Sequence, residues 1–233
     1  MTVHQLDEVD LYKEGLIKYG SRGYPVSQIQ RFLDELGYKI KPDGIFGNMT
    51  KIVVMDFQRH MGLKDDGIIG VLTKNAMYST DKEFYCPEVY KQIKPFVNYQ
   101  VSDIAKLLQY NLKGLEEAFW NAGYHWDIDC LHIIAHAVLE SDWGRSWIAR
   151  SKNNLFGWRA YDSSPYSSAH QLQNYEHCIM AWADWWNSTY LIKSGKYYNG
   201  CNEKGVNVKY ATSPIAGINK AFIVQNFRKR LNG

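Results

Sequence analysis

A glutamate follows the segment whose sequence most clearly predicts a buried helix. Leu131, Ile134 and Val138 recur at the spacing of one helix face, and Glu140 comes two residues after the last of them. A carboxyl group at this end of the helix, with Trp143 nearby, is expected to lose part of its hydration, and the helix dipole opposes its negative charge. Both effects favour the protonated form, in which a carboxyl group works as a general acid. A surface glutamate that merely ends a helix fits the same spacing.

Two histidines precede this glutamate on the same segment. His132 and His136 are four residues apart, a spacing that lets two imidazoles bind one zinc ion, and Glu140 continues the row. The zinc-peptidase pattern, however, needs a glutamate directly after the first histidine, where Ile133 stands. We therefore expect a histidine pair satisfied within the fold or at its surface, with no metal ion and no other cofactor. A metal-dependent endopeptidase is a distant alternative.

Composition limits the class of protein that carries these residues. The chain has 233 residues, 45% of them hydrophobic and 22% charged, which is typical of a globular protein. The sequence contains no run of about 18 apolar residues, so we expect no transmembrane helix. A net charge of +3 argues against a dedicated nucleic-acid binder. Most of the eight tryptophans lie between residues 126 and 186. They either form an aromatic core or line a cleft in which sugar rings stack.

A short repeat marks the first third of the chain. The run Asp-Gly-Ile-Phe-Gly at residues 43–47 recurs as Asp-Gly-Ile-Ile-Gly at residues 66–70. Asp-Gly sequences favour tight turns, and residues with helical periodicity flank both of them. We expect about three short helices over residues 15–79, and we take residues 1–79 as the first domain.

The repeat and its helices resemble the peptidoglycan-binding type 1 domain. The matching pattern includes the run Leu-Gly-Tyr at residues 36–38 and the pair Phe57-Gln58, in addition to both Asp-Gly turns. The resemblance implies a three-helix fold that attaches a protein to the bacterial cell wall. A small helical spacer without binding activity is the alternative.

A second domain is expected after a linker. Residues 80–97 include Pro87 and Pro95, which interrupt helix propagation, and they show no clear periodicity. Residues 98–233 then form the larger domain. The four cysteines of the chain are widely spaced, so we expect free thiols and no zinc ribbon or redox pair.

The larger domain carries a motif that begins at Glu140. Glu-Ser-Asp-Trp-Gly-Arg-Ser at residues 140–146 is followed by Asn-Asn-Leu-Phe-Gly at residues 153–157. These runs, in this order and spacing, resemble glycoside hydrolase family 73, the glucosaminidases of bacterial and phage wall lysins. The resemblance covers about residues 98–233 and implies a mainly α, lysozyme-like catalytic domain. We add a minor β element within residues 155–176.

The resemblance also implies roles for individual residues. Glu140 matches the glutamate that donates a proton to the glycosidic oxygen, and Tyr175 matches a tyrosine near the reacting sugar. Most glycosidases use a second carboxylate, for which Glu176 and Asp162 are candidates. Attack by the acetamido group of the substrate, or a transglycosylase path without water, stays open. The expected substrate-binding residues are Trp143, Asn153, Asn154, Phe156, Gly157, Trp158, Tyr161, Asp162 and Tyr210.

These observations predict a peptidoglycan hydrolase that cleaves the β-1,4 bond between N-acetylglucosamine and N-acetylmuramic acid. A muramidase or lytic transglycosylase on the same polymer is the nearest alternative, and a non-catalytic wall-binding protein is another. Residues 1–8 lack the features of a secretory signal. This start and the two-domain layout resemble a phage endolysin. We therefore expect a monomer that is made in the host cytoplasm, reaches the wall through a holin-type pore, and contacts peptidoglycan but neither nucleic acid nor the membrane interior.

Overall fold

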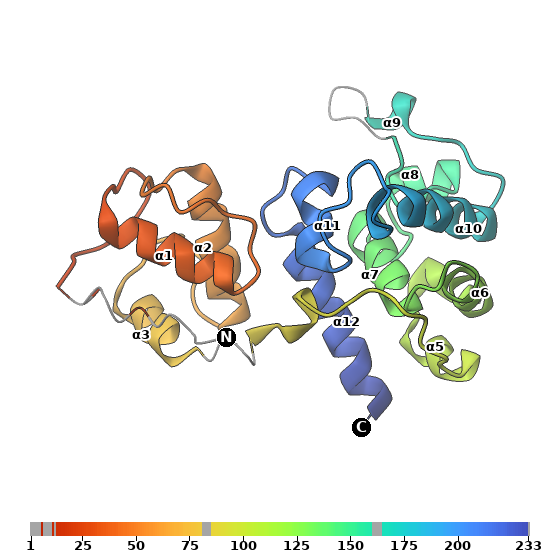
Figure 1. Cartoon of the computed structure of the whole chain (residues 1–233), viewed down its shortest axis with the longest axis horizontal. Helices are drawn as coiled ribbons and strands as arrows, with labels where there is room; N and C mark the ends of the chain where they lie inside the picture. The colour runs from red at the N-terminus through yellow and green to blue at the C-terminus, as the bar shows by residue number, and fades with distance from the viewer. Residues whose placement is uncertain (1–5, 7–10, 12, 81–84, 160–164, 233) are drawn as a thin grey trace.

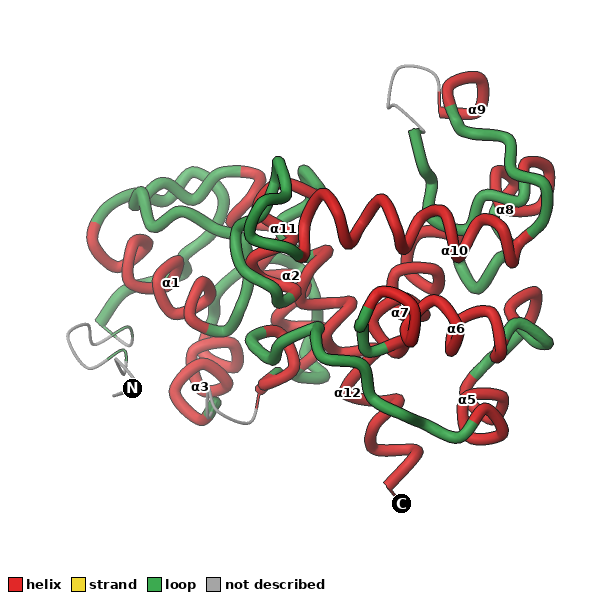
Figure 2. The backbone as a smooth tube through the Cα atoms, turned by 45° about the vertical axis from the view of Figure 1, so that its right-hand side comes forward, coloured by secondary structure: helices red, strands yellow, loops and turns green. Residues whose placement is uncertain are grey.

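The computed structural model describes residues 6, 11, 13–80, 85–159 and 165–232. Helices dominate this part of the chain (Figure 2), and β pairing within it is limited to two isolated bridges, Ile17 with Ile69 and Arg22 with Ile45. None of the described helices is long and apolar enough to cross a membrane. The mainly α fold expected from the sequence is confirmed.

The first three helices form an N-terminal module around an apolar core. They are α1 (Tyr24–Glu35), α2 (Asn48–His60) and α3 (Val71–Ser79). In the core, the rings of Phe32 and Phe57 meet edge to face with centroids 5.9 Å apart. The expectation of three short helices is confirmed for this module.

Each Asp-Gly turn of the repeat is organised by one buried glutamine. The amide of Gln58 donates hydrogen bonds to the carbonyl of Ile68 and the hydroxyl of Thr73, both at 3.0 Å. Its carbonyl accepts a bond from the Gly67 N–H at 2.9 Å. Gln30 makes the equivalent bonds around the first turn. Because Gly67 has φ +73°, a backbone conformation that favours glycine, the repeat encodes one turn geometry that is used twice.

Helix α7 (Cys130–Ser141) is the centre of the C-terminal domain. Ten of its twelve residues are buried, and Asp129 caps its N-terminus by accepting a bond from the Leu131 N–H at 3.0 Å. Figure 1 shows the other helices of the domain arranged around it. They are α5 (Val101–Leu107), α6 (Glu116–Trp126), α8 (Trp147–Lys152), α9 (Pro165–Ser168), α10 (Tyr175–Trp186), α11 (Glu203–Tyr210) and α12 (Ala216–Asn232), with short turns η1 (Pro87–Val89), η2 (Tyr110–Leu112) and the π-helical η3 (Asn187–Leu191).

The minor β element expected within residues 155–176 is wrong for the described part of that segment. Residues 155–159 and 165–176 form turns, the short helix α9 and the start of α10. The side chain of Asn154 holds the loop backbone in place here. Its amide donates hydrogen bonds to the backbone carbonyls of Trp158 at 3.0 Å and His170 at 3.1 Å. Backbone carbonyls that already accept a hydrogen bond from a side chain do not need a donor from a neighbouring β-strand.

The predicted linker is packed into the fold. Val89 belongs to the core of the N-terminal module, and Ile93 belongs to the core of the C-terminal domain. Glu88 is 3% exposed and forms an ion pair with Arg228 of α12 at 3.2 Å. The described linker residues therefore form a fixed connection between the two cores.

Helix α12 contributes to both parts of the molecule. Ile218 and Ala221 are fully buried in the core of the N-terminal module, whereas Phe227 lies in the core of the C-terminal domain. Phe222 stacks on His60 of α2 with ring centroids 4.1 Å apart. In Figure 1, α11 and α12 accordingly lie between the N-terminal module and the remaining helices.

The four cysteines are free thiols inside the protein. Cys86, Cys130, Cys178 and Cys201 are all buried, as single residues without disulfide partners. Burial raises the pKa of the Cys86 and Cys178 thiols to about 12. They remain protonated at neutral pH, and such thiols are poor nucleophiles.

Truncation of Phe222 is expected to weaken the docking of the N-terminal module. Phe222→Ala removes the stack on His60 and an edge contact with Tyr85, and we expect a loss of about 2 kcal/mol in the free energy of unfolding. Urea denaturation, followed by tryptophan fluorescence, measures this change. The control is Tyr19→Ala, because Tyr19 is 60% exposed and its truncation should cost less than about 0.5 kcal/mol. Equal effects of the two substitutions would contradict the docking role.

Candidate active site

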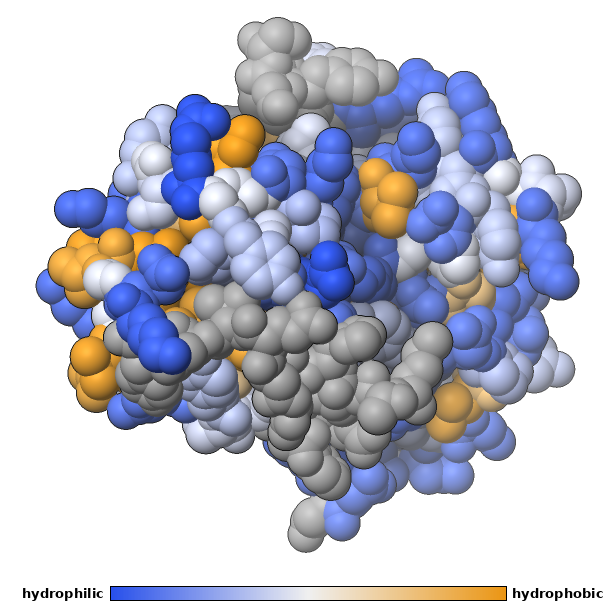
Figure 3. Space-filling view, turned by 60° about the vertical axis from the view of Figure 1, so that its left-hand side comes forward, coloured by the Kyte–Doolittle hydropathy of each residue, from blue (hydrophilic) through white to orange (hydrophobic). Residues whose placement is uncertain are grey.

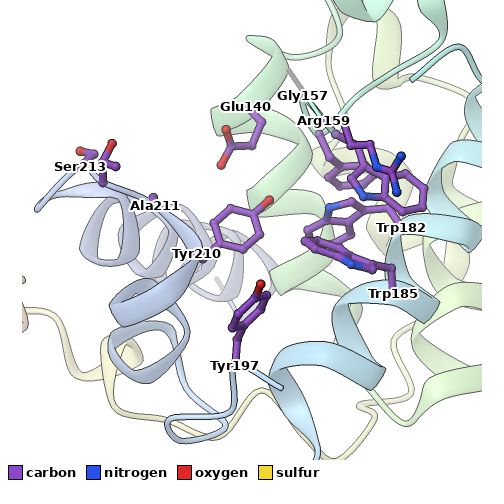
Figure 4. Close-up of a pocket in the computed structure, with 12 residues that line it drawn as sticks. Glu140, Gly157, Arg159, Trp182, Trp185, Tyr197, Tyr210, Ala211 and Ser213 are labelled. Carbon is purple, nitrogen blue, oxygen red and sulfur yellow. The ribbon is translucent and has the colours of Figure 1, made fainter. Parts of the chain in front are cut away.

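A cleft of about 720 Å³ opens at the C-terminal end of α7. Its lining comes from α7, from the loop that follows α8, from α10, from the segment between η3 and α11, and from the end of α11 with the residues after it, as Figure 4 shows. On one side lie a carboxylate and a tyrosine, and on the other lies a group of aromatic rings. The lining residues are Glu140, Phe156, Gly157, Trp158, Arg159, Trp182, Trp185, Tyr197, Tyr210, Ala211, Thr212 and Ser213.

Residues of the Glu140 motif end the helix and hold the turn behind the glutamate. The Ser141 hydroxyl, which is buried, accepts a bond from the Gly144 N–H at 2.8 Å. Gly144 has φ +78°, and a Cβ there would lie 2.9 Å from the Cβ of Asn111. Ser146 caps the next helix by accepting a bond from the Ala149 N–H at 3.2 Å. The motif thus fixes the direction in which α7 ends, and this places Glu140 at the cleft.

The surroundings of Glu140 differ from the sequence expectation. Its side chain is 28% exposed, and its Oε1 lies 3.2 Å from Nζ of Lys220 on α12. Trp143, which was expected to desolvate it and to bind substrate, has φ +59° and packs against Phe227 with ring centroids 6.1 Å apart. The described lining of the cleft does not include Trp143. The structure therefore places it away from this cleft, because a left-handed turn directs it to the domain core.

Stacked rings form the wall opposite Glu140. Phe156 and Trp182 lie parallel, with centroids 4.0 Å apart and 5° between their planes. Trp182 is fully buried, whereas Trp158 and Trp185 are half-buried, with ring centroids 5.7 Å apart. Aromatic faces of this kind pack against the apolar faces of sugar rings. Phe156, Gly157 and Trp158 therefore lie where the sequence predicted them, in the cleft.

Asn153 and Asn154 hold the loop that carries the aromatic residues of the cleft. Asn154 is 1% exposed, and its Oδ1 accepts a bond from the Trp158 N–H at 2.9 Å. Asn153 ends α8 with φ +52° and donates to the carbonyls of Leu172 and Gln173 at 3.1 and 3.0 Å. Neither side chain lines the cleft as described. Their amides are instead bonded to the loop backbone and shape it.

A buried polar network lies on α7 below Glu140. Nδ1 of His132 lies 2.8 Å from Oε1 of Glu203, and Nε2 of His136 lies 3.4 Å from its Oε2. All three side chains are at most 1% exposed. Burial lowers the pKa of His136 to about 4, and the charge of Lys220 acts in the same direction. Burial raises the pKa of Glu203, but its interactions with His136 and its hydrogen bond with His132 outweigh this and lower the pKa overall.

This network accounts for the two histidines that could have indicated zinc. Both imidazoles turn to Glu203, which is on α11 and far from them in sequence, and not to Glu140. Within the described residues, no group of three His, Cys, Asp or Glu side chains is arranged to hold a metal ion.

Tyr210 and Tyr197 complete the tyrosine side of the cleft. Burial raises the pKa of Tyr210 well above its ordinary value, and the negative charge of Glu140 acts in the same direction. The Tyr210 ring also lies 4.2 Å from the Lys220 ammonium. Figure 4 shows the hydroxyl groups of both tyrosines and the Glu140 carboxylate around the same space. Tyr210 lines the cleft, and its contact with substrate stays a prediction.

The other expected catalytic residues lie elsewhere. Glu176 is exposed on α10 and lines a separate hollow of about 470 Å³ with Glu117 and His125. The structure therefore does not bring it opposite Glu140, because the start of α10 faces α6. Tyr175 is half-buried beside the core and is absent from the described cleft lining. Tyr161 and Asp162 lie outside the described residues.

Several residues of the cleft were not singled out from the sequence. The density of tryptophans indicated an aromatic site, but it did not separate Trp182 and Trp185 from those in the core. Tyr197 and Arg159 are not among the residues that the sequence predicted to bind substrate. Lys220 stands in a segment of mixed composition, so only its neighbours in space reveal its place beside Glu140.

Two family matches cover most of the chain. Residues 22–77 match the family described as "Putative peptidoglycan binding domain". Residues 116–221 match the glucosaminidase family, described as "Mannosyl-glycoprotein endo-beta-N-acetylglucosaminidase". The chain thus combines a cell-wall-binding module with a carbohydrate-active domain. More specifically, it joins a peptidoglycan-binding domain to a glucosaminidase domain of glycoside hydrolase family 73.

Similar proteins agree with this division. A "Putative endo-beta-N-acetylglucosaminidase" of Streptococcus pneumoniae TIGR4 is 35% identical over 153 residues, which are 63% of this chain and 23% of that protein. The spore cortex-lytic enzyme of Bacillus cereus is 34% identical over 79 residues, which are 34% of this chain and 30% of that protein. The chain therefore spans about a quarter of the length of the streptococcal relative.

Solved structures show the same fold. Autolysin E of S. aureus has a TM-score of 0.54 at 18% identity, with 79% of this chain and 92% of that chain covered. A catalytic mutant of autolysin E in complex with the disaccharide NAG-NAM has a TM-score of 0.53 at 16% identity, with 79% and 93% covered. The expected mainly α, lysozyme-like architecture is confirmed.

Acid is expected to destabilise the protein through His136. Its pKa falls from 6.5 to about 4 on folding, so the unfolded chain binds the proton more tightly. The stability that neutral His136 contributes is therefore present above pH 6.5 and is lost as the pH falls to about 4. We expect the free energy of unfolding to fall by about 3 kcal/mol over this range. Denaturant unfolding at steps between pH 7 and pH 4 measures it. His136→Phe cannot titrate and should show a shallower dependence; an equal slope in the two proteins would contradict the assignment.

Proposed function

We propose that the protein is an endo-β-N-acetylglucosaminidase that hydrolyses the β-1,4 bond between N-acetylglucosamine and N-acetylmuramic acid in peptidoglycan. The observation that carries the proposal is the position of Glu140, which faces an aromatic wall across a cleft of about 720 Å³ within the glucosaminidase domain. The attached peptidoglycan-binding domain supports the same polymer as substrate. The cleft is large enough for sugar residues, and its rings offer faces for stacking.

Glu140 is the proposed general acid. It donates its proton to the glycosidic oxygen, so that the bond to the leaving sugar breaks as the carboxylate forms. Among the described lining residues, it is the one carboxylate. This favours attack by the acetamido group of the substrate over activation of water by a second carboxylate. Asp162 remains the candidate for that second group.

Neutralisation of Glu140 is expected to abolish catalysis. Glu140→Gln keeps the size of the side chain but cannot donate a proton, so we expect kcat on purified peptidoglycan to fall at least about 1000-fold, within the range for removal of an essential acid. Turbidity loss and released reducing sugar measure the effect. Asp142→Asn, on the exposed turn two residues later, is the matched control and should retain activity. An active Glu140→Gln protein would show that the acid is another residue.

The products of digestion distinguish a glucosaminidase from a muramidase and from a lytic transglycosylase. A glucosaminidase leaves N-acetylglucosamine at the new reducing end, whereas a muramidase leaves N-acetylmuramic acid. A lytic transglycosylase leaves an anhydro sugar with no reducing end. Mass spectrometry of borohydride-reduced digests of purified peptidoglycan distinguishes the three. We expect reduced N-acetylglucosamine ends, and either other product would overturn the proposed bond specificity.

A shallow groove on the N-terminal module is the proposed contact with the wall. It has a volume of about 400 Å³ and lies beside the second Asp-Gly turn. Three apolar residues at its edge, Leu16, Val71 and Leu72, are 64%, 63% and 70% exposed. Figure 3, turned toward this module, shows apolar patches among polar residues on this side of the molecule.

Loss of one exposed apolar side chain in this groove is expected to weaken wall binding. In the Glu140→Gln background, which leaves the wall intact, Leu72→Ser should reduce affinity for insoluble peptidoglycan about fivefold, the effect of about 1 kcal/mol of apolar burial. Sedimentation of the bound fraction measures it. Met49 holds the equivalent position after the first turn and is 45% exposed, so Met49→Ser is the control. Equal losses in both variants would contradict a groove-specific contact.

We further propose that the protein acts as a phage endolysin. The combination of a wall-binding module and a glucosaminidase domain supports it. In that context, the protein accumulates as a monomer in the host cytoplasm and reaches peptidoglycan through a holin-type pore. Expression in a bacterial host should then cause lysis only when a pore-forming protein is also produced. Lysis without such a pore would contradict this context.

A further inference from the structure

Lys220 is a buried charge next to the proposed proton donor, and no sequence motif marks it. Its side chain is 1% exposed, and its Nζ lies 3.2 Å from Oε1 of Glu140. Removal of an ammonium group from water costs several kcal/mol unless a nearby anion offsets the loss. Lysines are therefore rarely buried without a partner. Glu140 is that partner among the described residues.

Groups on two helices, α11 and α7, surround this ion pair. On α11, the face of the Tyr210 ring lies 4.2 Å from the Lys220 ammonium and favours its positive charge. On α7, His136 is neutral near pH 7 because burial and Lys220 lower its pKa to about 4. The carboxylate of Glu203 on α11 is hydrogen-bonded to His132 and lies 3.4 Å from His136. Lys220 is thus the cation that faces Glu140 from the buried side.

Other cleft residues add little charge at this position. Helix α10 presents Trp182 and Trp185, which are uncharged. Arg159 lines the same cleft, but it is exposed and lies on the loop that carries the aromatic wall. In Figure 4, Arg159 lies on the aromatic side, across from Glu140. Water screens an exposed charge more strongly than a buried one, so Lys220 has the stronger effect on the glutamate.

The backbone that carries Lys220 is firmly held. Ile218 and Ala221, on either side of it, are fully buried in the core of the N-terminal module. Phe222 stacks on His60 with ring centroids 4.1 Å apart. Lys220 therefore approaches the cleft from a helix that is anchored on the far side by the peptidoglycan-binding domain.

We propose that Lys220 is a positioning residue that controls the proton of Glu140. The proposal rests on the proposed function, in which the O–H bond of Glu140 breaks and the proton passes to the glycosidic oxygen. A carboxylate forms in this step, and a fixed ammonium 3.2 Å away stabilises the developing negative charge. Lys220 therefore stabilises the carboxylate as it forms and orients the carboxyl group of Glu140.

The pH profile of Lys220→Met tests this role. Methionine keeps the length of the side chain without its charge, so Glu140 should hold its proton to higher pH. We expect the alkaline limb of kcat/KM on a soluble peptidoglycan oligosaccharide to move up by about 1 pH unit. We also expect kcat on the acidic plateau to fall at least about tenfold, with KM changed less than about twofold, because the ammonium acts mainly in the transition state. Lys220→Arg keeps the charge and should keep the alkaline limb of the parent protein.

A matched buried lysine separates charge control from general destabilisation. Lys74 of α3 is 4% exposed and donates bonds to the carbonyls of Glu14 at 2.7 Å and Gly15 at 2.9 Å, far from the cleft in the fold. Lys74→Met should lower the melting temperature but leave the alkaline limb in place. If Lys220→Met does not fold, as judged by circular dichroism, Lys220→Gln replaces it in the same assay.

A readout independent of activity completes the test. In protein labelled with carboxyl-¹³C glutamate, the Glu140 resonance, assigned by its loss in Glu140→Gln, should titrate at higher pH in Lys220→Met than in the parent. An unchanged titration, or an alkaline limb that stays in place, would overturn the role of Lys220. An active Glu140→Gln protein would instead overturn the proposed function, so the two failures are distinguishable.

Discussion

Burial of α7 is the constraint on which the rest of the structure depends. An apolar helix that is enclosed by its neighbours meets solvent only at its end, so Glu140 is placed where the cleft begins. The same burial creates a requirement, because two imidazoles inside a protein need polar partners. Glu203 supplies that partner and joins α11 to α7. Tyr210, at the end of α11, is thereby brought beside Glu140, and one packing arrangement builds the polar side of the site.

The wall-binding module and the catalytic domain share structural elements. Helix α12 contributes apolar residues to the module and Lys220 to the cleft. A second contact lies at the rim, where Lys39 of the module donates bonds to the carbonyls of Ala211 at 2.8 Å and Pro214 at 2.9 Å. Ala211 lines the cleft. These contacts set the orientation of the N-terminal module relative to the cleft.

Much of the fold could be predicted because its signals are local. Helical periodicity and two Asp-Gly turns depend on residues that are close in sequence, and they indicated the three helices of the N-terminal module. The run that starts at Glu140 likewise contains its own helix end, with Ser141 and Gly144 bonded to each other. The β element was predicted wrongly because Asn154 satisfies the loop backbone through its side chain, a choice that residue type alone does not reveal.

The sequence by itself determined the helical class, the two-part layout, and the place of Glu140 at the end of an apolar helix. Only the tertiary structure decided what surrounds that glutamate. It turned Trp143 to the core and Glu176 to another face, and it brought Lys220 to within 3.2 Å of the carboxylate from 80 residues away. The physical reason is that electrostatic and stacking partners are selected by distance in space, and the packing of whole helices sets that distance.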